Sequence, residues 1–150
     1  MFKTVIFDID GVLADNRHRL HLISKEKQDW DSFFAELSND EPFHNVIRLY
    51  NALLPAHNII ICTGRPEEHR ARTRIWLNRH SVVNWDEMMM RPTGDYRPAV
   101  EVKREMLYRI LNNPERKDIA FVFEDEPKLV KMYRDLGITC FQHDLAGLDF

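Results

Sequence analysis

The sequence predicts an α/β fold, an open parallel five-stranded sheet with helices on both faces. Three observations predict it. Short apolar runs alternate with helix-like segments along the 150 residues, as in repeated β-α units. The clearest of these runs are almost continuously apolar, which is typical of parallel strands covered on both faces. Polar side chains follow several runs, at the strand ends where such folds bind their ligands.

Five segments have the composition of strands. The first, second and fourth are rich in Val, Ile and Phe, whereas the third contains three consecutive methionines, whose strand propensity is poor. The predicted strands are 3–9, 57–63, 87–91, 119–124 and 138–142.

Five further segments have the spacing of helices. Pro42 and Pro66 suit the first turn of a helix, and Gly137 suits the position just after one. The predicted helices are 29–37, 42–54, 66–80, 99–111 and 127–136. Two of them replace one within the first crossover, so we expect residues 15–41 to form a small helical cap insert over the site.

Length and composition indicate a single domain spanning residues 1–150. The chain is 44% hydrophobic and 30% charged, with a formal net charge of -3, which favours a soluble globular protein. This net charge gives no overall argument for nucleic-acid binding, although local basic patches could still bind phosphates. No apolar run approaches a membrane span, and the N-terminus does not resemble a signal peptide. Cys62 and Cys140 have no paired spacing, so we expect a reduced, cytoplasmic protein.

The first polar cluster is Asp8-Ile9-Asp10-Gly11, directly after an apolar run. Because a strand alternates its side chains, Asp8 and Asp10 project together, and Gly11 lets the backbone turn at once. Two carboxylates this close repel by roughly 1–4 kcal/mol, which a bound cation would relieve. The pattern predicts a metal site with a carboxylate able to act as nucleophile or base. The alternative is a solvated turn, where Asp and Gly are common.

Three more clusters fall at strand ends or helix starts. Thr63-Gly64-Arg65 offers a hydroxyl, backbone N–H groups and a guanidinium for a phosphate, or simply a helix N-cap. Lys103 suits the same phosphate, although a helical lysine is usually a solvated charge. Glu124-Asp125 either leads the chain to solvent or, if strand four lies beside strand one, completes a magnesium site with Asp8 and Asp10.

The ordered set of these four clusters resembles the motifs of the haloacid dehalogenase (HAD) phosphatase superfamily, which has a Rossmann-like fold. Within it, the chain is similar to the 3′-phosphatase domain of phage polynucleotide kinase-phosphatases. The likeness extends over nearly the whole chain. It includes residues 5–13, 59–65, 94–97, 102–103, 140–142 and 149–150.

The resemblance implies a role for each motif residue. Asp8 would be the nucleophile and Asp10 the general acid/base, and Mg²⁺ would be held by Asp8, the Asp10 backbone carbonyl and Asp125. Glu124 replaces the first of an aspartate pair and would lie behind the metal ligands. The expected phosphate and substrate contacts are Thr63, Gly64, Lys103, Arg19, Arg65 and Arg97.

Two expectations accompany these roles. A general acid must hold a proton when the leaving group departs, so we expect the pKa of Asp10 to lie above that of Asp8. An acidic residue that the family has four positions before the motif lysine is Ala99 here, which weakens the transfer of substrate preference.

The leading hypothesis is a Mg²⁺-dependent phosphomonoesterase that forms an aspartyl-phosphate and acts on the 3′-phosphate of a nucleic-acid end. A 5′(3′)-deoxyribonucleotidase acting on mononucleotides is the close alternative, and a phospho-receiver signalling module is a remote one. The chain contains no GxxxxGK[ST] loop, so we expect no kinase domain in it. The role of the cap and the oligomeric state stay open.

Overall fold

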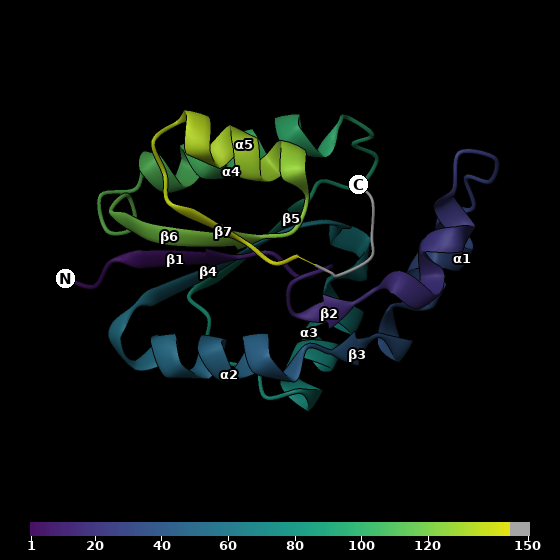
Figure 1. Cartoon of the computed structure of the whole chain (residues 1–150), viewed down its shortest axis with the longest axis horizontal. Coiled ribbons are helices and arrows are strands. Elements are labelled where there is room, and N and C mark those ends of the chain that lie inside the picture. Colours follow the sequence, from purple (N-terminus) through teal and green to yellow (C-terminus); the bar gives the residue numbers. More distant parts are fainter. Residues whose placement is uncertain (145–150) are drawn as a thin grey trace.

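The computed structural model describes residues 1–144 of the chain. At its centre is a parallel sheet of five strands in the order β5-β4-β1-β6-β7 (Figure 1). The strands are β1 (Thr4–Phe7), β4 (Asn58–Pro66), β5 (Glu87–Arg91), β6 (Ile119–Glu124) and β7 (Cys140–Gln142). The predicted α/β fold with its open parallel sheet is confirmed, and β6 lies directly beside β1.

Two pairs of helices cover the sheet. In Figure 1, α2 (His44–Leu53) and α3 (Arg70–Arg79) lie on one face, and α4 (Ala99–Leu111) and α5 (Pro127–Asp135) on the other. Because strand side chains alternate, Val5 packs in one core with Trp76 of α3, whereas Ile6 packs in the other core with Leu107 of α4. Burial on both faces explains why the central strands are almost wholly apolar.

Both prolines predicted to open helices belong to strands instead. Pro42 lies in β3 (Glu41–Pro42), which pairs with the equally short β2 (Ala14–Asp15). Pro66 closes β4 with an extended ψ of 147°, and a 3-10 turn (Glu67–His69) precedes α3. Proline favours such extended positions at strand edges as readily as a first helical turn, so its presence alone did not place the helix starts.

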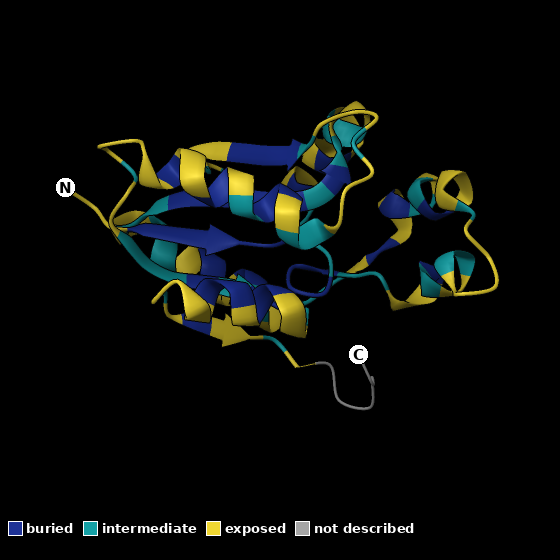
Figure 2. Ribbon diagram, turned by 90° about the horizontal axis from the view of Figure 1, so that it is seen from above, coloured by how far each residue is buried: buried dark blue, intermediate teal, exposed yellow. Residues whose placement is uncertain are grey.

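The insert between β2 and β3 is mostly helical, as expected. It holds a 3-10 helix (Arg17–Ile23), α1 (Trp30–Ala35) and a 3-10 turn (Leu37–Asn39), and we call residues 15–41 the cap. Asp29 begins α1 by accepting a hydrogen bond from the Ser32 N–H at 3.1 Å. Figures 1 and 2 both place the cap beyond the carboxyl ends of the strands. The sequence did not predict the β2–β3 ribbon, since two-residue strands leave no hydrophobic period.

None of the helices within residues 1–144 combines the length and apolar character needed to cross a membrane.

Candidate active site

The carboxyl ends of β1 and β6 bring three carboxylates together. Asp8 directly follows β1, Glu124 is the last residue of β6, and Asp125 is next in the chain. One oxygen of each lies within 4.8 Å of the others. Asp8 and Glu124 are buried, with 6% and 1% of their surface exposed. The pairing of β6 with β1 is therefore what assembles this acidic cluster.

Lys103 provides the positive charge inside the cluster. Its ammonium lies 2.8 Å from Asp8 Oδ1 and 2.7 Å from Glu124 Oε2, and the side chain is buried on α4. Burial alone would lower the pKa of Lys103, but the carboxylates of Asp8 and Glu124 outweigh it and hold that pKa well above its usual value. The lysine is thus a fixed cation of the site rather than a solvated surface charge.

One lysine does not offset three carboxylates. Burial, followed by the charge of Glu124, raises the pKa of Asp8 well above its usual value. Burial and the charge of Asp8 raise the pKa of Asp125 to about 7. Such shifts mark excess negative charge in a poorly solvated place, and the donors are all oxygen. The cluster therefore fits a hard divalent cation such as Mg²⁺.

Glu124 is the carboxylate least available to a metal. Its Oε2 accepts the hydrogen bond from Lys103, and its Oε1 accepts one from the Asp125 N–H at 3.0 Å. Asp8 and Asp125 keep the freer oxygens. This arrangement agrees with Glu124 acting behind the metal ligands, by holding the lysine and the backbone of Asp125.

Gly11 gives Asp125 the space it occupies. The glycine has a φ of +80°, and a Cβ at this position would lie 2.0 Å from Asp125 Oδ2. Any other residue would face both an unfavourable backbone conformation and a collision with the carboxylate. The turn that follows the aspartate pair is thus matched to the second acidic strand end.

Asp10 belongs to a different set of charges. Arg65 donates to it through Nε at 3.0 Å and Nη2 at 2.8 Å, and Arg19 donates through Nη2 at 2.6 Å. Although burial raises the pKa of Asp10, the arginines, Arg65 foremost, lower it to about 2. The expectation that the pKa of Asp10 exceeds that of Asp8 is therefore wrong for the free protein, because both arginines stabilise the carboxylate.

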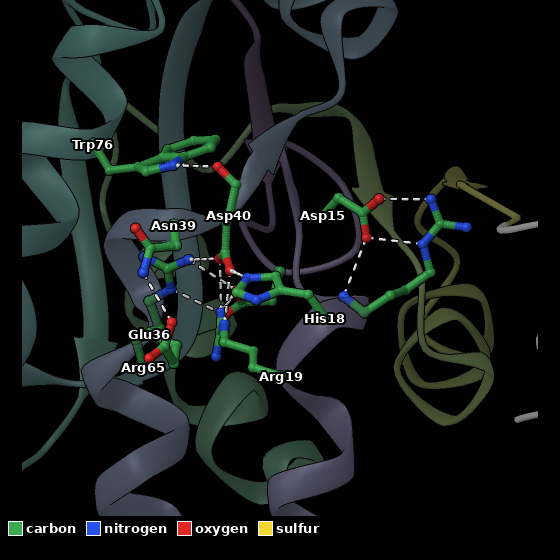
Figure 3. A network of polar contacts seen from close by, with 10 residues as sticks. Asp15, His18, Arg19, Glu36, Asn39, Asp40, Arg65 and Trp76 are labelled. Atoms are coloured by element: carbon green, nitrogen blue, oxygen red, sulfur yellow. Dashed lines mark hydrogen bonds and ion pairs between the residues drawn. The ribbon is translucent and has the colours of Figure 1, made fainter.

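A second carboxylate, Asp40, holds the same two arginines from behind (Figure 3). Arg19 donates to both of its oxygens at 2.8 Å, and Arg65 donates at 3.2 Å. His18 Nε2 lies 2.7 Å from Oδ1, and the Trp76 indole donates to the Asp40 backbone carbonyl at 2.9 Å. Asp40 and both arginines are buried. This network joins the cap to the sheet at the active site.

Asp40 is not among the residues that the sequence predicts for the site. It follows Asn39 in no recognisable motif and closes a 3-10 turn. The sequence carries no signal for it, because Arg19 and Arg65, whose charges it balances, meet beside Asp10 only in the folded chain.

The remaining predicted residues fall in two places. Thr63 is buried after the middle of β4, and its Oγ1 accepts the Arg65 N–H at 3.1 Å; since α3 begins only at Arg70, neither Thr63 nor Gly64 is its N-cap. Arg97 does not reach the acidic cluster. It lies exposed in the loop before α4 and pairs with Asp95 of that loop and Glu105 of α4.

A cavity of 540 Å³ connects the two charge sets. Predicted residues from all four motifs line it, namely Asp8, Asp10, Gly64, Lys103, Glu124 and Asp125. Residues 149–150, which belong to the sequence resemblance, lie outside the described part of the chain. The arrangement offers a buried carboxylate next to a cation, and a second carboxylate facing the same space, as attack on a phosphate monoester requires.

A parallel sheet whose first strand ends in such an aspartate pair, beside a lysine and a second acidic strand end, defines a phosphatase of the HAD type. A family model described as the polynucleotide kinase PNKP phosphatase domain matches residues 2–147, and the chain belongs to this family. Membership selects a hydrolytic enzyme over a phospho-receiver module.

Individual relatives are more distant. A bifunctional polynucleotide kinase/RNA ligase of Autographa californica nuclear polyhedrosis virus is 26% identical over 138 residues, which are 91% of this chain and 18% of the relative. In a solved Pnkp1/Rnl/Hen1 RNA repair complex, one chain matches with a TM-score of 0.80 at 23% identity, over 99% of this chain and 44% of that chain. The chain thus spans less than half the length of either.

A third match is a hydrolase of the haloacid dehalogenase-like family from Streptococcus pneumoniae. It has a TM-score of 0.66 at 15% identity and covers 94% of this chain and 84% of that chain. This likeness supports the HAD fold.

Replacing Asp40 by Asn should strongly destabilise the protein. The change keeps the shape of the side chain but leaves Arg19 and Arg65 buried without a full counter-charge. The free energy of unfolding should therefore fall by about 3–5 kcal/mol. Urea denaturation followed by circular dichroism measures it. Asp15→Asn, which breaks an aspartate–arginine pair with the exposed Arg17, is the matched control and should cost far less. Equal stability of the two variants would contradict the structural role of Asp40.

Replacing Gly11 by Ala should displace Asp125. Gly137 is the matched control, since its φ of +77° carries the same backbone penalty but no atom lies within 4 Å of its missing Cβ. We expect Gly137→Ala to lose about 1 kcal/mol of unfolding free energy and to bind divalent cation as before. Gly11→Ala should lose more and should need a higher cation concentration in a calorimetric titration. Identical titrations of the two variants would separate Gly11 from the acidic cluster.

Proposed function

We propose that this chain is a Mg²⁺-dependent phosphomonoesterase that removes the 3′-phosphate from a nucleic-acid end through an aspartyl-phosphate. One observation carries the chemistry: Asp8 and Asp10 line a single cavity but lie in separate ion-pair sets. Asp8 contacts Lys103, and Asp10 contacts Arg19 and Arg65. Two carboxylates with different partners can perform two different tasks.

Asp8 acts as the nucleophile. A carboxylate oxygen of Asp8 forms a bond to phosphorus while the bond from phosphorus to the sugar oxygen breaks, and Asp10 gives that oxygen a proton. Water then attacks the aspartyl-phosphate, Asp10 takes a proton from it, and Asp8 and inorganic phosphate are released. Lys103, the Thr63 hydroxyl and the Gly64 N–H hold the phosphoryl oxygens.

A bound Mg²⁺, held by Asp8, Asp125 and the backbone carbonyl of Asp10, supplies positive charge that lets a phosphate approach the carboxylates. The residues that fit it are the oxygen donors of the acidic cluster described above. Glu124 keeps Lys103 and Asp125 in position behind them.

The arginines fit the two halves of the reaction. Their hydrogen bonds to Asp10 favour its carboxylate form, which is the form that accepts a proton from water in the second half. The first half needs Asp10 protonated, so at least one hydrogen bond from Arg19 or Arg65 to Asp10 must weaken or break. The substrate's own phosphate is an anion toward which a guanidinium can turn.

A nucleic-acid end is the proposed substrate because of the family. Its model describes the phosphatase domain of a polynucleotide kinase, and the viral relative is a polynucleotide kinase/RNA ligase. One observation favours a mononucleotide instead: the net charge of -3 gives the chain no overall attraction for a polyanion. A 5′(3′)-deoxyribonucleotidase is therefore the second candidate.

Replacing Asp8 by Asn should abolish hydrolysis of an aryl phosphate in the presence of Mg²⁺. Loss of the nucleophile should reduce kcat by roughly 10³-fold or more. The fold should persist because the buried Lys103 keeps Glu124 as its counter-charge. Asp118→Asn, which breaks an exposed pair with Lys3 just before β6 and at the opposite end of that strand from Glu124, serves as the control and should keep full activity. Substantial turnover by a folded Asp8→Asn protein would refute an aspartyl-phosphate on this residue.

A substrate panel tests the rest of the proposal. We expect kcat/KM for a 3′-phosphorylated oligonucleotide to exceed that for the same oligonucleotide with a 5′-phosphate, and that for 3′- and 5′-mononucleotides, by at least about tenfold, or about 1.4 kcal/mol. Phosphate release measured at matched Mg²⁺ gives these values. A preference for the mononucleotides would favour the nucleotidase.

A further inference from the structure

A second groove adjoins the catalytic cavity, and the proposed mechanism makes no use of it. It has a volume of 720 Å³ and lies between α1 of the cap and the loop 92–98 that precedes α4. Gly64 and Ala99 line both this groove and the catalytic cavity. A molecule whose phosphate reaches Asp8 can therefore extend directly into the groove.

The walls of the groove are aromatic. On the cap side, Trp30 stacks on Phe34 at a centroid distance of 5.8 Å, and Phe34 in turn contacts the ring of His69 at 4.8 Å. Trp30 is 45% exposed. On the loop side, Tyr96 is 94% exposed, although a tyrosine ring is costly to leave in water. Flat apolar faces thus stand on both sides of the groove.

The charges of the groove nearly balance. Its acids are Asp31, Glu68 and Asp95, and its bases are Arg72, Arg91 and Arg97. All three arginines are engaged. Arg97 pairs with Asp95, Arg91 donates to the Gly64 and Arg97 carbonyls, and Arg72 donates to the Phe34 carbonyl. A row of phosphates would gain little here. Flat, polar-edged rings would gain stacking, and His69 Nδ1, buried without a hydrogen-bond partner within residues 1–144, could bond to such an edge.

We infer that the groove binds the nucleobases of a single strand that lie 5′ to the nucleotide bearing the terminal 3′-phosphate, with Trp30 and Tyr96 as stacking platforms. This inference rests on the proposed function and names the part of the substrate that the cap recognises. Nucleobases stack on aromatic side chains whatever their identity, so the groove would read the presence of a strand rather than its sequence. It would also let a chain with a net charge of -3 prefer a strand to a mononucleotide.

Two pairs of variants and one control variant test the inference. Trp30→Ala and Tyr96→Ala remove a ring, and Trp30→Phe and Tyr96→Phe keep one. Tyr108→Ala removes a half-exposed tyrosine from α4 outside the groove and is the matched control. The substrates are thymidine 3′-phosphate, the 3′-phosphorylated dinucleotide and hexanucleotide of thymidine, and an aryl phosphate, all at one Mg²⁺ concentration.

For the unsubstituted protein we expect kcat/KM to rise from the mononucleotide to the hexanucleotide. Each alanine variant should lose roughly tenfold on the hexanucleotide, as the removal of one stacking partner does elsewhere. Each should keep its activity on thymidine 3′-phosphate and the aryl phosphate within about twofold, and the phenylalanine variants should restore most of the loss. Tyr108→Ala should behave like the unsubstituted protein.

Binding gives a second readout that needs no turnover. In an Asp8→Asn background, fluorescence anisotropy of a labelled, 3′-phosphorylated hexanucleotide should show weaker binding for Trp30→Ala and Tyr96→Ala than for Tyr108→Ala. Equal affinity across these variants, or an equal loss of activity on the hexanucleotide and the aryl phosphate, would overturn the inference.

The panel separates this inference from the proposed function. If the unsubstituted protein prefers the hexanucleotide but the alanine variants do too, the groove is not the strand site and the proposed substrate stands. If the unsubstituted protein hydrolyses the aryl phosphate but shows no preference for the longer strands, the proposed polynucleotide substrate fails, and the inference about the groove fails with it.

Discussion

The buried contact between Asp40 and two arginines is the interaction on which the rest of the site depends. Arg19 comes from the cap and Arg65 from the end of β4, and both also hold Asp10. Burying four charged groups is tolerable here because two carboxylates meet two guanidinium groups in mutual hydrogen bonds. The cap's attachment and the placement of Asp10 are therefore one and the same network.

The neighbouring cluster has the opposite balance. Within residues 1–144, Lys103 is the one cation that pairs with Asp8 and Glu124. Burial and the surplus of negative charge raise the pKa values of Asp8 and Asp125. A network whose charges balance suits a structural role, whereas an unbalanced one can still gain from a new partner. Asp8 and Asp10 line one cavity but have different charged neighbours. Their carboxyl groups therefore differ in pKa although they are only two residues apart.

Much of this arrangement could be predicted from the sequence because it depends on local patterns. The apolar runs predict the strands, and the polar residues after them predict that Asp8, Asp10 and Asp125 meet. Asp40 could not be predicted, since its partners are 21 and 25 residues away and no local pattern marks it. The predicted order of the Asp8 and Asp10 pKa values was wrong for the same reason. These pKa values depend on which distant charges surround each carboxylate. Arg97 was also predicted to contact the substrate, but it pairs with Asp95 and Glu105 instead.

The β2–β3 ribbon has a consequence for how this enzyme class can diversify. Because Ala14 pairs with Pro42 and Asp15 with Glu41, the chain enters the cap and leaves it at adjacent points. Residues can be added or removed between these points without lengthening any path through the core, and loop length itself costs little free energy. The cap between β2 and β3, and with it the substrate range, can thus change while the active-site residues stay the same. This requires that Asp40, or an equivalent anion, still pairs with the arginines beside Asp10.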